Sequence, residues 1–268
     1  MKIIRFLTEA NDIRRGVVES LEDQTAYIIM GNLFDYFWVS KERESIKKIL
    51  PPVIPPNIIG IGLNYAKHAD ETNIRYPEIP VMFLKGVNAV TGHLDPIILP
   101  KAGPDEVDYE AELAIVISKA AKNVSVDEAK DYIFGYCCAN DVSARDWQIK
   151  KQKTQWCRGK SFDTFCPLGP MLVTADEITN PDNLNIQIEI NGTIYQKSNT
   201  SDMIFNVATL VSDLSQSMTL LPGTVILTGT PEGVGFTRQP PVFLKEGDQV
   251  TVSIENLGNL INPVIREK

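Results

Sequence analysis

A run of prolines near residue 50 limits the fold more than any other feature of the sequence. Residues 51–57 read Pro-Pro-Val-Ile-Pro-Pro-Asn. Proline lacks a backbone N–H and pushes the residue before it towards extended backbone, so neither a helix nor a central strand can run through this segment. We therefore predict a domain boundary here, with a small N-terminal α+β module over residues 1–56 and a larger domain over residues 57–268.

Short apolar runs rich in β-branched residues alternate with turn residues in both parts of the chain. Such runs, bounded by glycine, proline, asparagine or aspartate, are typical of strands. We predict strands at residues 2–7, 25–30, 33–39, 58–63, 112–118, 132–139, 185–190, 224–228 and 250–254. The predicted fold class is therefore α+β and predominantly β.

Helices are indicated at three places. The charged stretch 40–50 has a helical character and supplies the helix of the N-terminal module. Ser125 and Glu128 have the spacing of a capping box, in which each side chain accepts a hydrogen bond from a backbone amide at the start of a helix. A third helix is predicted over residues 202–218, where one apolar stripe recurs at helical spacing until Leu-Pro-Gly at 221–223 ends it.

The charge balance excludes one large class of partners. The formal net charge is −8, whereas binding to nucleic acid normally requires a basic face. We therefore expect a small-molecule substrate and no nucleic acid. Four cysteines contain no CxxC pair, and a hydrophobic content of 43% can fill a core without disulfides, which indicates reduced thiols.

The sequence contains no segment that directs it to a membrane. No apolar run approaches the ~18 residues that a membrane-spanning helix needs. Arg5 and Glu9 interrupt the first residues before a signal-peptide apolar region can form. We therefore expect a cytoplasmic protein with no membrane partner.

Three acids form a candidate metal site. Glu110 and Glu112 begin an apolar strand, and residues two apart in a strand project to the same face. Their charges repel, and burial would keep one carboxyl protonated unless a cation lies between them. Asp141 follows the apolar run 133–139, and an all-oxygen set suits Mg²⁺ or Mn²⁺. The alternative is that the two glutamates only mark the solvated end of a strand.

Four ordered segments resemble the signature blocks of the fumarylacetoacetate hydrolase family. They are Asp-Tyr-Glu-Ala-Glu-Leu-Ala at 108–114, Asn-Asp-Val-Ser-Ala-Arg-Asp at 140–146, Arg-Gly-Lys-Ser-Phe-Asp-Thr-Phe at 158–165 and Thr-Gly-Thr-Pro-Glu-Gly-Val-Gly at 228–235. Together they span the chain from about residue 58 to 265, and their order is specific where one block is only suggestive. The chain looks most similar to the acylpyruvase and 2-hydroxyhepta-2,4-diene-1,7-dioate isomerase branch.

The resemblance implies properties that composition and periodicity do not show. It implies a mixed β-sandwich roll and a homodimer. It also implies Mg²⁺ or Mn²⁺ held by the residues that match the family's ligands, namely Glu110, Glu112 and Asp141.

His68 and Glu71 are candidates for proton transfer. A neutral imidazole is the side chain best suited to accept a proton near neutral pH. On a helix, residues three apart share a face, so Glu71 could orient the ring and stabilise its charged form. An isolated pair at this spacing is usually a surface ion pair, but the resemblance implies a similarly placed pair that activates water in family members that hydrolyse acylpyruvates.

Further residues are assigned by their place in the matching blocks. Lys160 would stabilise a developing enolate oxygen, and the Thr230 hydroxyl in the glycine-rich loop would bind a substrate carboxylate. Arg145 and Gln148 are candidates for substrate contact, with a structural role in fixing Asp141 as the alternative. His93 has no acidic partner at helical spacing and is interpreted as structural.

The leading hypothesis is hydrolytic cleavage of a C–C bond in a small 2,4-dioxo acid, an acylpyruvate, through a metal-stabilised enolate. Oxaloacetate decarboxylation and the isomerisation or tautomerisation of 2-hydroxy-dienoic acids use the same enolate chemistry and are the alternatives. A hypothesis of another class is a non-catalytic, metal-binding relative. That hypothesis predicts loss of the acids or of the His68 and Glu71 pair, and both sets are present.

Overall fold

The strand-forming runs assemble into one long sheet and a smaller sheet that faces it. The computed structural model describes residues 1–268. Its strands, in chain order, are β1 (Lys2–Leu7), β2 (Ile13–Val18), β3 (Thr25–Gly31), β4 (Phe37–Ser45), β5 (Lys48–Leu50), β6 (Ile58–Gly62), β7 (Val81–Lys85), β8 (Val90–Thr91), β9 (Ile97–Leu99), β10 (Val107–Asp108), β11 (Ala111–Ile117), β12 (Ile133–Asn140), β13 (Ser143–Ala144), β14 (Cys166–Thr174), β15 (Asn185–Ile190), β16 (Thr193–Asn199), β17 (Val225–Leu227), β18 (Gln249–Ile254) and β19 (Gly258–Arg266).

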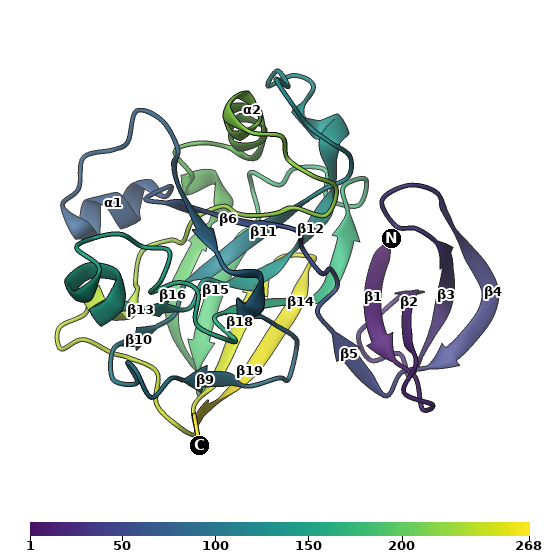
Figure 1. Ribbon diagram of the computed structural model, residues 1–268, viewed down its shortest axis with the longest axis horizontal. Coiled ribbons are helices and arrows are strands. Elements are labelled where there is room, and N and C mark those ends of the chain that lie inside the picture. Colours follow the sequence, from purple (N-terminus) through teal and green to yellow (C-terminus); the bar gives the residue numbers. More distant parts are fainter.

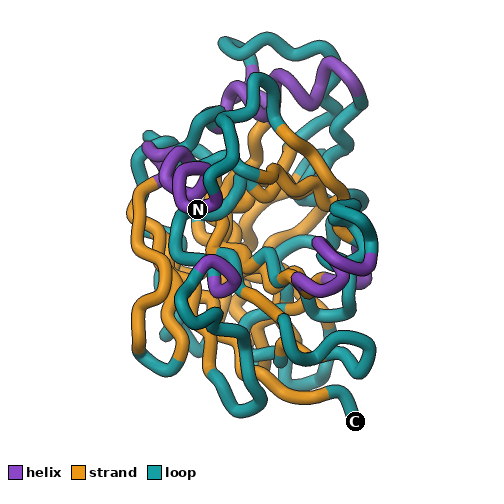
Figure 2. Tube along the Cα trace, turned by 90° about the vertical axis from the view of Figure 1, so that its left-hand side faces the viewer, coloured by secondary structure: helices purple, strands orange, loops and turns teal.

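Helices are few and short, and they lie around the strands (Figure 2). The α-helices are α1 (Ala66–Thr72) and α2 (Val207–Ser217), a π-helix covers Asp146–Lys151, and 3₁₀ turns cover Val87–Ala89, Ala129–Tyr132, Thr200–Asp202 and Gly235–Thr237. No helix is both long and apolar enough to span a membrane.

The long sheet has the order β4-β3-β2-β1-β14-β12-β11-β17-β6-β7, with β5 paired to β1 and β8 paired to β14. The smaller sheet has the order β16-β15-β18-β19-β9, and β10 pairs separately with β13. Strands β11, β12 and β14 contact β15, β18 and β19 across the space between the sheets. Every residue of β11 and of β14 is buried, so the main core lies around these central strands (Figure 1).

The first 50 residues form strands only, which corrects the predicted helix at 40–50. This stretch instead makes β4 and β5. The charged side chains of β4 are mostly exposed, and β4 ends the long sheet, where charged side chains discourage further pairing. Pairing with β3 therefore overrides the local preference for helix.

The N-terminal strands are continuous with the rest of the molecule. Strand β1 pairs with β14 through Lys2 with Val173 and Ile3 with Leu172, while β1 to β4 extend to one side (Figure 1). Residues 51–57 contain neither helix nor strand, as their prolines predict. The domain boundary itself stays a prediction.

The two other predicted helices are shorter than expected. Ser125 donates to the Glu128 carboxylate from its amide, at 3.1 Å, and from its hydroxyl, at 2.6 Å, but only one 3₁₀ turn follows because β12 begins at Ile133. Helix α2 begins at Val207 instead of residue 202. The amides of residues 204 and 205 donate to Asn64, and Asn206 then caps the helix by accepting from the Thr209 amide at 2.9 Å.

We expect acid to destabilise the protein partly through His93. Its Nδ1 accepts a hydrogen bond from the Ile261 amide at 3.2 Å, and burial lowers the pKa of His93 below its usual 6.5, with Asp95 opposing in part. The unfolded chain therefore takes up this proton at a higher pH than the folded chain. The contribution of His93 to stability is complete above about pH 6.5 and is lost as the pH falls below that value.

The measurement is the urea midpoint between about pH 7 and about pH 5 for wild type and His93→Gln. The midpoint of wild type should fall more steeply than that of the variant. Equal slopes would show that His93 does not contribute.

Candidate active site and metal centre

Three acids meet at the end of the central strands, as their positions in the sequence predict. Glu110 directly precedes β11, Glu112 is its second residue, and Asp141 directly follows β12. Because Ala111 pairs with Asn140, the Asp141 amide donates to the Glu110 carbonyl at 2.9 Å. One carboxylate oxygen from each acid lies within 4.8 Å of the others, and all three residues are buried.

Buried bases surround these acids. Lys160 Nζ lies 2.6 Å from Glu110 Oε2 and 2.6 Å from Asp141 Oδ2. Lys85 Nζ donates to Asp141 Oδ1 at 2.5 Å, and its side chain is fully buried. Arg145 Nη2 lies 2.8 Å from Glu110 Oε1. Asp141 is therefore held by two lysines, and Glu110 by one lysine and one arginine.

Glu112 is the acid without a cationic partner. Its Oε2 accepts a hydrogen bond from the Gly229 amide at 2.7 Å, and no ion pair involves it. Burial, followed by repulsion from Asp141 and Glu110, raises the pKa of Glu112 well above its usual range. By contrast, burial alone would raise the pKa of Glu110, but Lys160 and Arg145 outweigh it and lower that pKa to about 2.

The charge balance of the core fits a bound cation. Every buried lysine, arginine, aspartate and glutamate of the chain belongs to this one cluster: Lys85, Asp108, Glu110, Glu112, Asp141, Arg145 and Lys160. Ionised, the four acids exceed the three bases by one negative charge, and a buried unpaired charge is unfavourable. Three carboxylates form the oxygen set that Mg²⁺ and Mn²⁺ prefer. The residues present therefore fit a divalent cation.

We expect chelation to lower the melting temperature as well as any metal-dependent activity. An ion bound only by the folded state stabilises it by about 2.7 kcal/mol when its concentration is 100 times its Kd, which corresponds to roughly 5–10 °C for a chain of this size. The melting temperature should be measured with Mn²⁺ and with excess EDTA. Glu112→Gln, which keeps the size of the side chain, should lose most of this difference. An unchanged wild-type melting temperature would contradict a shared metal site.

The predicted His68 and Glu71 pair forms on α1. His68 Nδ1 lies 2.7 Å from Glu71 Oε1, and no protein group is hydrogen-bonded to the ring's Nε2. Glu71 also accepts from the Gly233 amide at 3.0 Å and from the Thr237 hydroxyl at 3.2 Å. Although burial would raise the pKa of Glu71, its bonds to His68 and to Gly233 lower it. An ionised Glu71 accepts a hydrogen bond from Nδ1–H, which leaves the Nε2 lone pair available.

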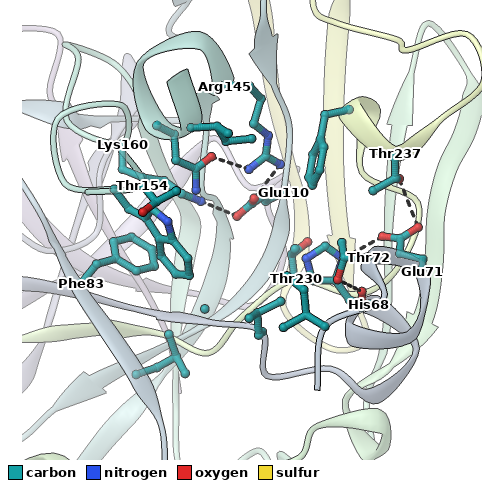
Figure 3. A pocket seen from close by; sticks show the side chains of 18 of the residues that line it. His68, Glu71, Thr72, Phe83, Glu110, Arg145, Thr154, Lys160, Thr230 and Thr237 are labelled. Carbon is teal, nitrogen blue, oxygen red and sulfur yellow. Dashed lines mark hydrogen bonds and ion pairs between the residues drawn. The ribbon is translucent and has the colours of Figure 1, made fainter. Parts of the chain in front are cut away.

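One cavity of about 520 Å³ joins the two groups of residues. Figure 3 shows Glu110 and Lys160 on one side of it and His68 with Glu71 on another. Its lining residues are Ile61, Gly62, Leu63, His68, Glu71, Thr72, Ile74, Phe83, Glu110, Glu112, Arg145, Gln148, Ile149, Thr154, Trp156, Lys160, Thr230, Phe236, Thr237 and Gln239. Asp141 does not line the cavity itself, but it is ion-paired with Lys160, which does.

The remaining predicted residues also reach the cavity. Thr230 lines it and accepts a hydrogen bond from Gln196 Nε2 at 2.8 Å. Gln148 accepts from Arg145 Nη1 at 2.8 Å, and both line the cavity. Arg145 contacts Asp108 and Glu110, so the acid it helps to hold is Glu110, whereas the alternative from the sequence was Asp141.

Two important contributors were not predicted from the sequence. Asp108 is fully buried and accepts from Arg145 Nε at 2.8 Å and from the Gly235 and Phe236 amides at 2.8 and 3.1 Å. It therefore ties the glycine-rich loop to the arginine that holds Glu110. Trp156 lines the cavity from an irregular segment. Asp108 is the first residue of the family block at 108–114, so its block could have suggested a role. No local sequence pattern indicates that Trp156 lines the cavity.

Residues 57–265 match the family model described as Fumarylacetoacetate (FAA) hydrolase C-terminal. The chain belongs to the fumarylacetoacetate hydrolase family. The family resemblance drawn from the four sequence blocks is thereby confirmed.

Among members of this family, the chain is 50% identical over 223 residues to a mitochondrial oxaloacetate tautomerase of Xenopus laevis, which covers 83% of this chain and 70% of that protein. A mitochondrial oxaloacetate tautomerase of Rattus norvegicus is 48% identical over 223 residues, or 83% of this chain and 71% of that protein.

Solved structures of the family have the same fold. A 2-hydroxyhepta-2,4-diene-1,7-dioate isomerase from Mycobacterium marinum has a TM-score of 0.86 at 38% identity and covers 100% of this chain and 99% of that one. A 5-carboxymethyl-2-hydroxymuconate delta-isomerase from Mycobacterium smegmatis has a TM-score of 0.87 at 38% identity, with both chains fully covered. The predicted fold class, predominantly β and of the fumarylacetoacetate hydrolase type, is thereby confirmed.

Proposed function

We propose that this protein transfers a proton within a small 2-oxo acid and so interconverts the keto and enol forms of a substrate such as oxaloacetate. The observation that carries the proposal is the position of His68. Its ring is held by Glu71 at 2.7 Å and borders the same cavity as the buried acids Glu110 and Glu112. A general base thus lies across the cavity from a site suited to a cation.

The chain's own residues can perform the proton transfer. Glu71 holds Nδ1–H, so Nε2 of His68 accepts a proton from the carbon beside the 2-oxo group and can return it to oxygen. Lys160, buried and charged, lines the cavity and can stabilise negative charge on the 2-oxo oxygen. Thr230, Arg145 and Gln148 are proposed to contact the substrate carboxylate.

We propose Glu110, Glu112 and Asp141 as ligands of Mg²⁺ or Mn²⁺. Such an ion, when bound, supplies positive charge that polarises the 2-oxo group and makes the adjacent C–H more acidic. The predicted homodimer and cytoplasmic location remain predictions.

Acylpyruvate hydrolysis, the leading hypothesis from the sequence, becomes the second candidate. The relatives at 48–50% identity are named tautomerases and the neighbouring structures are named isomerases, which favours proton transfer without water. The free Nε2 of His68 nevertheless favours hydrolysis too, because the same lone pair can accept a proton from water. Decarboxylation of oxaloacetate needs no such base.

Two assays with one enzyme preparation distinguish these reactions. The first follows the ultraviolet absorbance of enol oxaloacetate, and the second measures pyruvate released from oxaloacetate and from acetylpyruvate. Each is run with Mg²⁺, with Mn²⁺ and with chelator. Metal-dependent loss of the enol signal without pyruvate release supports tautomerisation.

The other outcomes identify the alternatives. Pyruvate from acetylpyruvate would assign hydrolysis, and pyruvate from oxaloacetate above the metal-only rate would assign decarboxylation. Absence of any enol conversion above the protein-free rate would overturn the proposal.

A further inference from the structure

One side of the cavity is formed by two aromatic rings that the proposed proton transfer does not use. The Phe83 and Trp156 rings meet edge to face, with centroids 5.7 Å apart at 71°. Both residues line the cavity, and we call this pair the aromatic wall. In the view of Figure 3, Phe83 and the His68–Glu71 pair lie on opposite sides of Glu110. Phe83 therefore lies on the side of Glu110 away from the general base.

Two glycines of β6 make room for these rings. A Cβ added to Gly60 would lie 2.2 Å from the Phe83 ring, and one added to Gly62 would lie 2.2 Å from the Trp156 ring. Real Cβ contacts are essentially never this short, so each ring rests directly on glycine backbone. Any larger residue at either position would therefore displace the ring that rests on it.

Other apolar side chains continue the wall. Ile61, Leu63 and Ile149 line the same cavity. The backbone of Leu63 has φ 55°, a left-handed conformation that is uncommon for a residue with a side chain. Such conformations are kept where the surrounding structure requires them, often at binding sites. At Leu63 this conformation turns the chain from β6 towards α1, and the Leu63 side chain lines the cavity.

The charges on the cavity favour an uncharged ligand group at this wall. Arg145 and Lys160 are the only lysine or arginine residues in the lining, and both are paired with buried acids. A carboxylate placed against the two rings of the aromatic wall would therefore meet no unpaired cation, and burying it unpaired is costly. The volume of about 520 Å³ also falls in the range of drug-sized ligands and exceeds the need of a four-carbon acid.

We infer that the aromatic wall is a specificity site that binds an uncharged apolar substituent of the 2-oxo acid, beyond the small head group. The inference rests on the proposed function in that Lys160 binds the 2-oxo oxygen and Thr230, Arg145 and Gln148 bind the adjacent carboxylate. The substrate class is therefore 2-oxo acids whose substituent is aromatic or alkyl, in addition to small acids such as oxaloacetate.

The test measures binding, so it does not depend on turnover. Isothermal titration calorimetry with Mn²⁺ compares pyruvate with phenylpyruvate, which share the head group and differ by a phenyl ring. A second pair, 2-oxopentanoate and 2-oxoglutarate, has equal chain length and differs by a carboxylate. Phenylpyruvate should bind about tenfold or more tightly than pyruvate, and 2-oxopentanoate more tightly than 2-oxoglutarate.

Variants locate the effect. Trp156→Ala should reduce the ratio of phenylpyruvate to pyruvate affinity by about tenfold. Gly62→Ala keeps Trp156 but displaces its ring, so it should reduce the ratio in the same direction. Trp38→Ala is the matched control, because this tryptophan is 49% exposed in the N-terminal strands and lies outside the cavity, and its ratio should equal that of wild type.

Equal affinities within both ligand pairs, or a ratio that neither cavity variant changes, would overturn the inference. Loss of enol conversion with these binding ratios intact would instead overturn only the proposed function. Circular dichroism of each variant establishes that it is folded.

Discussion

Replacing His68 by glutamine is expected to lower kcat for oxaloacetate tautomerisation by about 10²- to 10⁴-fold, the range usual for loss of a positioned general base. Glutamine has a similar size and can still bond to Glu71, but its amide accepts no proton at neutral pH. Because the ring does not contact Glu110, Glu112 or Asp141 through hydrogen bonds, binding of Mn²⁺ should persist. The measurements are steady-state kinetics and Mn²⁺ titration by calorimetry.

The matched control is His93→Gln, which replaces the only other histidine of the chain. His93 accepts a hydrogen bond from the Ile261 amide and does not line the cavity. The kcat of the His93→Gln variant should equal that of wild type at neutral pH. A His68→Gln enzyme with kcat within about threefold of wild type would exclude His68 as the base. So small a change corresponds to less than about 1.4 kcal/mol in the activation barrier, the value for a tenfold change, whereas loss of a general base should cost at least about 10²-fold.

Replacing Asp108 by asparagine is expected to destabilise the fold by about 3–5 kcal/mol, as for removal of one partner from a buried ion pair. Asp108 is fully buried and accepts four hydrogen bonds, from the Tyr109, Gly235 and Phe236 amides and from Arg145. The asparagine amide has one acceptor oxygen where the carboxylate has two. Its NH₂ group would face one of the N–H donors and could not accept a hydrogen bond from it. Arg145 then stays buried, but the side chain at position 108 no longer carries the negative charge that pairs with it.

Urea denaturation followed by circular dichroism measures this loss. Asp105→Asn is the matched control, because Asp105 is exposed three residues earlier and makes no hydrogen bond or ion pair, so the free energy of unfolding should change by less than about 0.5 kcal/mol. A loss below about 1 kcal/mol in Asp108→Asn would show that solvent or a shift of Arg145 compensates the pair.

The secondary structure was predictable where the signal is local. The apolar runs that became β1, β11, β12 and β15 were located within one or two residues, because strand periodicity and turn residues are read directly from neighbours. The prediction of a helix at 40–50 is wrong because β4 takes its conformation from pairing with β3. The start of α2 was wrong because Asn64, distant in sequence, binds the two amides before it.

The proximity of the acids was predictable for the same reason. Glu110 and Glu112 are two apart at the start of one strand, and Asp141 directly follows the next strand, so a single antiparallel pairing brings them together. The 2.7 Å contact of His68 with Glu71 also follows from helical spacing alone. Their roles as ligands and base stay predictions, which the experiments above test.

The sequence alone determined the β-rich character, the family and the grouping of acids, because these depend on spacings of a few residues or on ordered motifs. Only the tertiary structure decided the charge balance and the shape of the cavity. Lys85 is 56 residues from Asp141, Asp108 is 127 from Gly235, and Trp156 rests on Gly62 from a separate segment. Contacts between residues this distant depend on how strands are ordered in a sheet, and no local pattern carries that information.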